Sequence, residues 1–255
     1  MKTDVQIARE FTSRPIGEIA DSIKVHDADL LPYGKDIAKV SLDALSRPRT
    51  VGAPSKLILV SAITPTPAGE GKTTTSIGLA QAFTQLDESV CLALREPSLG
   101  PCMGVKGGAC GGGYSQVMPL DRINLHFTGD FHAITATNNL LAAIIDNHLH
   151  FGNKLGLDTR KIMWRRVMDM NDRALRNIIS GMGGTGMGVP REGGFDITAA
   201  SEIMAILCLS SDMDDLRSRI ERIIVGYDES CASVNLHITH FQSETSRTSN
   251  LGAVI

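Results

Sequence analysis

The sequence predicts an α/β protein, a parallel β-sheet flanked by helices. Two short apolar runs, residues 57–63 and 90–94, have the length and composition of strands that are buried on both faces. Between them, residues 72–86 carry apolar side chains at helical spacing. Strand–turn–helix units that follow one another in this order favour a parallel sheet with helices on both faces.

Bulk composition narrows the class of protein further. The chain has 255 residues, of which 42% are hydrophobic and 21% charged, with a formal net charge of −3. This is a globular composition, long enough for one large core or two ordinary ones. The chain has no basic block, which disfavours nucleic acid as a partner, and no apolar run long enough to cross a bilayer. With no such run, we expect no membrane partner. Five scattered cysteines without a C-x-x-C pair indicate free thiols, so we expect a cytoplasmic protein.

The N-terminal part of the chain carries several of the expected helices and connections. Apolar residues at helical spacing predict two helices within residues 3–23, with Pro15 starting the second. Residues 37–44 form a further amphipathic helix candidate. The glycine-dense segment 104–113 is unsuited to the middle of a helix or strand, which indicates an irregular connection.

The second half of the chain continues the alternation of apolar patterns. Asp212 is the expected N-cap of the last helix, with Leu216, Ile220, Ile223 and Ile224 on its buried face. The expected elements, in chain order, are a strand at 123–127, helices at 130–148 and 162–179, a glycine-rich loop at 181–194, and helices at 198–209 and 212–225.

Residues 69–73, Gly-Glu-Gly-Lys-Thr, lie between a predicted strand and a predicted helix. Glycines allow several backbone N–H groups to point at one anion, and the helix start adds its dipole there. Lys72 can reach the β- and γ-phosphates of a nucleotide, and the Thr73 hydroxyl suits Mg²⁺. The usual G-x-x-x-x-G-K-[ST] pattern has glycine where this chain has Thr66. We interpret the segment as a variant phosphate loop in a P-loop NTPase-like domain; the alternative is a chance Gly-Lys-Thr in a turn.

Arg95 and Glu96 follow the second predicted strand. Ligands collect at the carboxyl edge of open parallel sheets, and an arginine fork binds carboxylate or phosphate through two hydrogen bonds. A neighbouring carboxylate can orient the arginine, bind metal-bound water or act as a base. The pair is therefore a candidate catalytic element, with a surface ion pair as the alternative.

Two further segments carry polar residues, and the sequence allows two roles for each segment. The stretch 104–113 contains Lys106 and is either a second anion-binding backbone surface or a flexible connector. Asp130 and His132 open a predicted helix, where they either belong to the site or act as N-cap and first-turn residue. With His126 and Thr128 they form a weak metal pattern, because no third ligand has a recognisable spacing.

Several long segments resemble the formate–tetrahydrofolate ligase family, from about residue 1 to Tyr227. Their number and order make the resemblance much more specific than the phosphate loop alone. The matching segments are residues 61–74, 95–101, 106–117, 124–135, 169–173 and 195–205.

The resemblance implies that formate is activated as formyl phosphate at the expense of ATP and passed to tetrahydrofolate, giving 10-formyltetrahydrofolate. It also implies Mg²⁺, stimulation by a monovalent cation, and a homotetramer. Lys72, Arg95 and Glu96 become catalytic residues, with Thr73 near Mg²⁺ through the nucleotide. Arg95, Lys106 and His132 become contacts of formyl phosphate. The implied ATP-binding residues are Thr66, Pro67, Ala68, Gly69, Glu70, Gly71, Lys72 and Thr73.

Two departures from the family pattern limit what the resemblance implies. The family is considerably longer, and its folate-stacking aromatic residues have no counterpart here, where Trp164 is the one tryptophan. We expect residues 1–227 to be the nucleotide-binding region of a truncated chain. Residues 228–255 match no family segment, and we expect residues 231–255 to stay outside the fold as a disordered tail.

Other functions stay open at this point. The phosphate loop alone also fits another carboxylate-activating ligase, of the dethiobiotin-synthetase type, or a partner-regulated ATPase. The missing folate region also fits a non-catalytic nucleotide-binding fragment. The segments downstream of the loop favour the formate ligase over its relatives.

Overall fold

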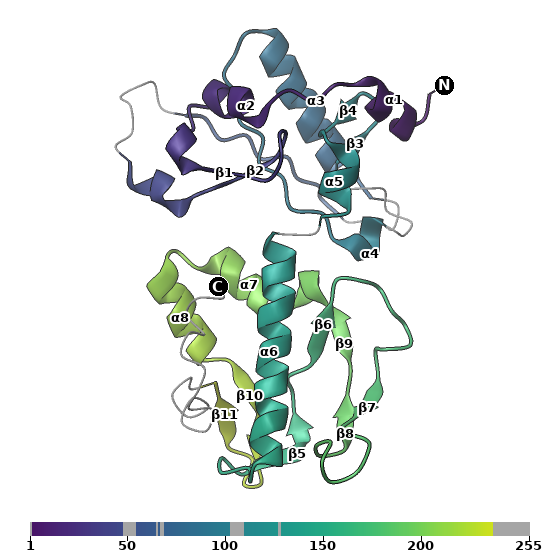
Figure 1. The fold of residues 1–255 in the computed structure, drawn as a ribbon, viewed down its shortest axis with the longest axis vertical. Helices are drawn as coiled ribbons and strands as arrows, with labels where there is room; N and C mark the ends of the chain where they lie inside the picture. Colours follow the sequence, from purple (N-terminus) through teal and green to yellow (C-terminus); the bar gives the residue numbers. More distant parts are fainter. Residues whose placement is uncertain are drawn as a thin grey trace. The chain divides into compact units, whose positions relative to one another are not determined.

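The computed structural model of the chain has a mixed α/β architecture (Figure 1). It divides into two compact units. The first unit contains Met1–Pro97 and Pro101–His126, and the second contains Ser98–Gly100 and Phe127–Ile255. The structure describes residues 2–47, 55–64, 66, 69–102, 110–126 and 129–236.

The two helices predicted at the N-terminus are confirmed. Helix α1, Asp4–Glu10, begins with a capping box: the Thr3 hydroxyl accepts the Gln6 N–H, and the Gln6 side chain accepts the Thr3 N–H. Helix α2, Ile16–Ser22, follows Pro15, which is its N-cap.

The helix predicted at residues 37–44 is wrong. Its first part is strand β2, Ala38–Val40, which pairs antiparallel with β1, Leu30–Pro32. Gly34 sits in the connecting turn with a φ of 89°. The hairpin turn brings β1 and β2 together, and their hydrogen bonds satisfy the backbone groups of residues 38–40. The weak helical spacing after the turn therefore does not determine the structure of this segment. Two 3₁₀ helices flank the hairpin, η1 at Asp27–Asp29 and η2 at Leu42–Ser46.

Helix α3, Lys72–Gln85, begins at the residue that the sequence predicts. It lies beside a small hairpin of β3, Gly111–Gly112, and β4, Ser115–Gln116, where Gln81 Nε2 donates to the Tyr114 carbonyl at 2.8 Å. A Cβ on Gly111 would lie 2.0 Å from the Ser115 carbonyl oxygen, so only glycine fits there. The short helices α4, Leu99–Cys102, and α5, Leu120–Asn124, complete this part of the chain.

The strands predicted at 57–63, 90–94 and 123–127 are wrong. The described residues of the first two runs form no β-ladder, and Ile123 and Asn124 belong to α5. Leu57 and Leu59 are 95% and 83% exposed rather than buried. Pairing of a parallel strand depends on distant neighbours, and a local apolar run does not encode them.

The second unit is built around helix α6, Asp130–His150, which the sequence predicts (Figure 1). Among the described strands of the chain, only β6 and β9 pair in parallel, so the predicted parallel sheet is wrong beyond that pair. The strands of this unit are β5 (Leu157–Ile162), β6 (Arg166–Met168), β7 (Ile178–Ser180), β8 (Arg191–Gly193), β9 (Phe195–Ile197), β10 (Ile224–Asp228) and β11 (Ser233–Asn235). Antiparallel pairing gives a three-stranded sheet in the order β11-β10-β5, and joins β7 to β8.

The helix predicted at residues 162–179 is wrong, because that range contains β6 and the start of β7 and no helix. The reason is visible in the contacts of α6. Asn138 Nδ2 donates to the Arg165 carbonyl at 2.9 Å, and the Asn139 side chain both donates to and accepts from the Val167 backbone. These tertiary bonds use backbone groups that a helix would have bonded internally.

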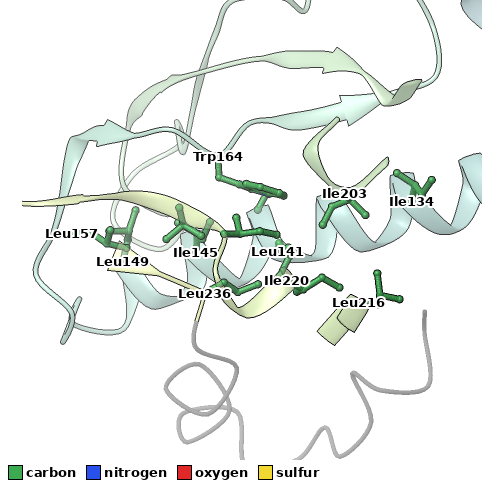
Figure 2. Close-up of a cluster of buried hydrophobic side chains, with 13 residues drawn as sticks. Ile134, Leu141, Ile145, Leu149, Leu157, Trp164, Ile203, Leu216, Ile220 and Leu236 are labelled. Atoms are coloured by element: carbon green, nitrogen blue, oxygen red, sulfur yellow. The ribbon is translucent and has the colours of Figure 1, made fainter. Parts of the chain in front are cut away.

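One apolar core fills the second unit, shown in Figure 2. Residues of one α6 face, among them Leu141 and Ile145, pack against the sheet and against Trp164. The Trp164 indole N–H donates to the Asn138 carbonyl at 3.1 Å, which satisfies its polar group inside the core. The buried members are Ile134, Leu141, Ala142, Ile145, Leu149, Leu157, Trp164, Ile203, Leu216, Ile220, Ile223, Val225 and Leu236.

An ionic contact joins α6 to two strands. Asp146 accepts hydrogen bonds from Arg166 Nη2 and from Arg191 Nη2, each at 2.6 Å. Arg191 is buried, so its charge depends on this carboxylate for compensation. The contact fixes β6 and β8 against one turn of α6.

Two helices complete the second unit near their predicted places. Helix α7, Glu202–Leu209, follows the 3₁₀ helix η3, Thr198–Ala200, and is capped by the Ser201 hydroxyl. Helix α8 spans Met213–Glu221 and is capped by Asp212, as predicted, with Asp212 Oδ1 accepting the Asp215 N–H at 2.8 Å. The helix ends before the predicted residue 225, and Ile224, expected on its buried face, begins β10 and is 41% exposed. No helix in the part of the chain that the structure describes is long and apolar enough to cross a membrane.

The prediction that the chain leaves the fold at residue 231 is wrong for residues 233–236. Strand β11 pairs with β10, and Leu236 is 2% exposed within the core. Alternating apolar residues let β11 complete the sheet, and burial of Leu236 offsets the entropy of ordering the segment. Residues 237–255, the rest of the predicted tail, lie outside the described residues.

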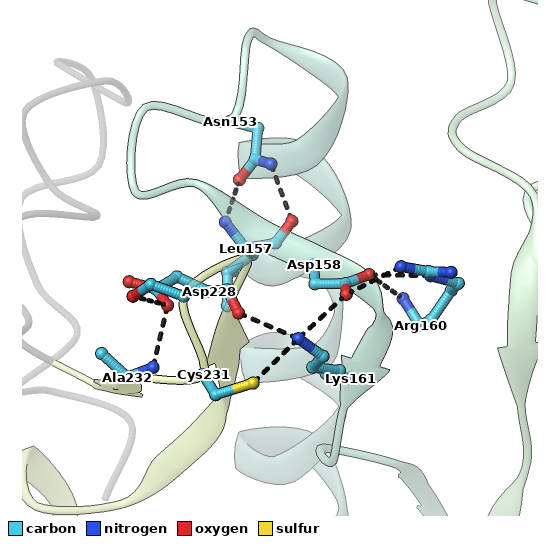
Figure 3. Close-up of polar contacts among 9 residues, drawn as sticks. Asn153, Leu157, Asp158, Arg160, Lys161, Asp228, Cys231 and Ala232 are labelled. Carbon is cyan, nitrogen blue, oxygen red and sulfur yellow. Dashed lines mark hydrogen bonds and ion pairs between the residues drawn. The ribbon is translucent and has the colours of Figure 1, made fainter.

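A polar cluster lies where the turn between β10 and β11 meets β5, shown in Figure 3. Lys161 Nζ contacts Asp158 Oδ2 at 3.3 Å, and donates to Cys231 Sγ at 3.3 Å and to the Asp228 carbonyl at 3.4 Å. The hydrogen bond to Cys231 is the main cause that raises the pKa of Lys161. The Arg160 backbone N–H and then its guanidinium lower the pKa of Asp158 to about 2.

We predict that Leu236→Ala lowers the free energy of unfolding by about 2–5 kcal/mol, because it removes a buried side chain and leaves a cavity. Urea unfolding followed by circular dichroism measures this. Leu209→Ala, at a leucine that is 68% exposed, is the control and should cost less than about 0.5 kcal/mol. Equal effects at the two positions would show that β11 is not part of the stable core.

The depressed pKa of Asp158 predicts a pH-dependent contribution to stability. A carboxyl group whose pKa is lower in the folded state stabilises that state above its unfolded pKa, near pH 4, and the contribution disappears as the pH falls through about 2. The stability difference between the wild type and Asp158→Asn should therefore shrink from about pH 5 to about pH 2. Urea midpoints across this range measure it, and a constant difference would contradict the assignment.

Candidate functional site

The glycine-rich loop of the first unit turns sharply before α3. The Gly69 N–H donates to the Thr66 carbonyl at 3.1 Å. Gly69 and Gly71 have φ angles of 86° and 69°, the left-handed region that glycine adopts without strain. Pro67 and Ala68, two of the expected ATP-binding residues, lie outside the described residues.

The start of α3 is open for an anion. Gly71 is the N-cap, no side chain caps the helix, and its first turn has no acidic residue. The first N–H groups of a helix lack internal partners and carry the positive end of its dipole. Lys72 is the first helical residue, is exposed, and forms no ion pair in the described part of the chain. Thr73, the next residue, is half-buried. The loop thus brings glycines, lysine and threonine to one helix start.

Arg95 and Glu96 follow a segment without regular secondary structure and have different environments. Arg95 is exposed, whereas Glu96 is half-buried and its Oε1 lies 3.5 Å from Nδ1 of the buried His126. The contact to His126 gives Glu96 a fixed direction. The sequence placed His126 only in a weak metal pattern and missed this pairing, because the two residues are thirty positions apart.

The other expected substrate contacts belong to other parts of the chain. His132 is exposed in the first turn of α6, in the second unit, and Lys106 lies outside the described residues. Asp130 is not the N-cap of α6, because Gly129 takes that place. In the ranges that the structure describes, no group of three or more His, Cys, Asp or Glu side chains is arranged to hold a metal ion.

A second polar group lies at the carboxyl edge of the parallel pair β6–β9. Asp169 directly follows β6, and its carboxylate accepts the buried Ser98 hydroxyl at 2.5 Å and the Leu99 N–H at 2.9 Å. Thr198 directly follows β9, is fully buried, and its hydroxyl lies 2.7 Å from that of Thr135. This edge is where ligands bind in parallel sheets.

Gly100 fits tightly against the same edge. A Cβ at this position would lie 3.1 Å from Cγ of Asn171 and 3.1 Å from Cδ1 of Ile197. The segment Ser98–Gly100, which follows the Arg95–Glu96 pair in the chain, is therefore held by both hydrogen bonds and packing. Sequence reasoning missed Asp169 as a contact because it placed this residue inside a helix, although its position after a strand is the signal that identifies it.

These features define a class of α/β proteins in which a glycine-rich loop leads into an uncapped helix, with further polar residues at the end of a parallel strand pair. The family model for formate–tetrahydrofolate ligase matches residues 2–246. The chain therefore belongs to the formate–tetrahydrofolate ligase family. The match extends beyond Tyr227, where the sequence resemblance was expected to stop.

A curated formate–tetrahydrofolate ligase from Zymomonas mobilis subsp. mobilis is 60% identical to the chain over 232 residues. The alignment covers 89% of this chain and 41% of the relative, so the chain spans less than half the length of that protein.

We predict that Asp169→Ala speeds hydrogen exchange of the Leu99 amide by about tenfold or more, because a hydrogen bond to a charged acceptor contributes about 1.5–3 kcal/mol. Exchange read by mass spectrometry or NMR measures this. Asp172→Ala is the matched control, because its carboxylate bonds Ala174 in the same segment and not Leu99. Unchanged Leu99 exchange in Asp169→Ala would refute the anchoring role.

Proposed function

We propose that this chain carries the ATP site of a formate–tetrahydrofolate ligase and activates formate as formyl phosphate. The observation that supports this most directly is the uncapped start of α3 behind the glycine-rich loop, in a chain of this family. The ATP-binding residues in this proposal are Thr66, Pro67, Ala68, Gly69, Glu70, Gly71, Lys72 and Thr73, within a P-loop NTPase-like nucleotide-binding region at residues 1–227.

The chemistry of the loop fits a triphosphate. The N–H groups of the first turn of α3 and the Lys72 ammonium are all donors, and no acidic side chain stands among them in that turn. When formate attacks the γ-phosphorus, negative charge is spread over the phosphoryl oxygens. Preorganised donors stabilise that charge without having to reorganise. Mg²⁺ would neutralise further phosphate charge, with the Thr73 hydroxyl as its protein contact.

Arg95 is the proposed clamp for formate and formyl phosphate. An exposed guanidinium without an ion pair in the described ranges is available to bind a small carboxylate through two hydrogen bonds. Glu96, directed by His126, is its neighbour in the pocket rather than its ion-pair partner. Lys106 and His132 complete the proposed contacts to formyl phosphate. Holding formate in line is a positioning effect, which lowers the barrier by fixing the reacting atoms.

The remaining parts of the proposal concern substrates and assembly. Tetrahydrofolate is the proposed acceptor of the formyl group, with a monovalent cation as activator and a cytoplasmic homotetramer as the working form. The Zymomonas protein is named for formate and tetrahydrofolate, which supports these substrates.

ATP binding without turnover is the second candidate function. The alignment covers 41% of the Zymomonas relative, and under this second candidate the whole ligase carries out the reaction while this chain only binds ATP. A carboxylate-activating ligase of the dethiobiotin-synthetase type is disfavoured by the family match. Formate-dependent release of ADP from the purified chain, without folate, would separate the activating enzyme from the binding fragment.

We predict that Lys72→Ala weakens ATP binding or phosphoryl transfer by about 2–4 kcal/mol, the effect of losing one preorganised charge stabiliser. Calorimetry with ATP and Mg²⁺ measures the binding part. Lys35→Ala removes an exposed lysine from the same unit and should leave ATP affinity unchanged. If both variants bind ATP like the wild type, Lys72 does not have the assigned role.

A further inference from the structure

A cavity of about 320 Å³ lies within the second unit, beside the parallel pair β6–β9. Strand β9 forms one wall, and residues from the segment 170–177 line it as well. Met168 and Ile197, the last residues of β6 and β9, also line it, so the cavity reaches the carboxyl edge of the pair, where parallel sheets bind ligands. None of the residues assigned to ATP or formate contributes to it.

The charges that line this cavity leave one arginine without an acidic partner. Asp196 Oδ1 lies 3.4 Å from Nη1 of Arg165, which pairs these two opposite charges. The Asp172 carboxylate accepts the Ala174 N–H at 2.9 Å, so it bonds the backbone of its own loop. Arg176 forms no ion pair within the described ranges of the chain. Its guanidinium is therefore the lining charge that a ligand would compensate.

The loop that carries Arg176 is tied to the strand pair. The Arg176 carbonyl accepts a hydrogen bond from Arg165 Nη2, and the Leu175 carbonyl accepts the Phe195 N–H at 2.9 Å. Arg165 Nε is buried without a hydrogen-bond partner, so a second guanidinium with an unused donor stands at the same wall. The backbone position of Arg176 is thus fixed at this wall, whereas the charge of Arg165 is paired with Asp196.

The rest of the lining sets the size and polarity of the ligand. Phe195 and Ile197 are two apart on β9 and share one face, which gives an apolar wall together with Met168. Asn171 and Asn177 add amide donors and acceptors. At about 30 Å³ for each water, the cavity holds a ligand of about ten non-hydrogen atoms. An anionic head on a short apolar body matches this combination.

We propose that this cavity binds a small organic anion, with its carboxylate or phosphate group on Arg176 and its apolar body against Phe195. An arginine fork suits both head groups because each offers two oxygens at matching spacing. The site is separate from the ATP loop, and the proposal does not rest on the proposed function. It gives a role to the segment that begins at Asp169, which matches the family but has no place in the ATP or formate chemistry.

Calorimetric titration of the full chain at constant ionic strength tests the proposal, with benzoate and phenyl phosphate as probes and benzamide as the uncharged analogue. Each anion should saturate one site, and benzamide should not bind. Arg176→Ala should weaken anion binding by about tenfold or more, because it removes a charged donor and keeps the carbonyl that Arg165 bonds. Arg173→Ala changes the net charge equally in the same loop but does not line the cavity, so it should change affinity by less than about twofold.

The titrations are made in the Lys72→Ala/Arg95→Ala background, so that anion binding at the ATP loop and at the proposed formate clamp does not contribute. Equal weakening by Arg176→Ala and Arg173→Ala would show that the net charge of the chain alone causes the loss of affinity. That result would overturn the proposal. Binding of benzamide as tight as that of benzoate, or no anion binding, would also overturn it. Tighter binding of benzoate assigns a carboxylate head and tighter binding of phenyl phosphate a phosphate head, and either result supports the site.

Discussion

The side-chain amides of Asn138 and Asn139 connect the longest helix of the chain to strand β6, and the second unit depends on this connection. They bond the backbone at Arg165 and Val167, while the Trp164 indole N–H returns a hydrogen bond to the helix. Because β6 is fixed in this way, its partner β9 is positioned too, and both strands end at one edge. Asp169 and Thr198 stand at that edge for this reason.

The sequence predicted those parts of the fold that local chemistry determines. Helix α3 starts at Lys72 and helix α8 is capped by Asp212, because glycine turns, caps and amphipathic spacing act within a few residues. Strands were predicted poorly. The apolar run at 57–63 forms no ladder in its described residues, whereas residues 166–168, predicted as helix, pair with a strand twenty-nine positions away. Strand pairing is decided by distant partners, which local patterns do not contain.

The candidate site likewise combines local features, which the sequence predicts, with long-range contacts, which it does not. The loop at 69–73 was found because phosphate binding needs glycine, lysine and a helix start at adjacent positions. The contact between Glu96 and His126, and that between Ser98 and Asp169, join residues thirty or more positions apart, so only a structure brings them together. Each contact involves a residue that the sequence indicates for another reason: Glu96 as an expected catalytic residue, and Asp169 as the start of a segment that matches the family.

The carboxylate of Asp146 also constrains how this family can change. It compensates Arg166 on one strand and the buried Arg191 on another, each at 2.6 Å. Without the aspartate, two positive charges lack their compensating carboxylate. Loss of Arg191 alone leaves a buried position empty. Single replacements at these positions should therefore destabilise the fold, and tolerated replacements should come as matched sets. Across relatives the three positions should covary, so that an alignment alone would reveal the packing of this helix against its strands.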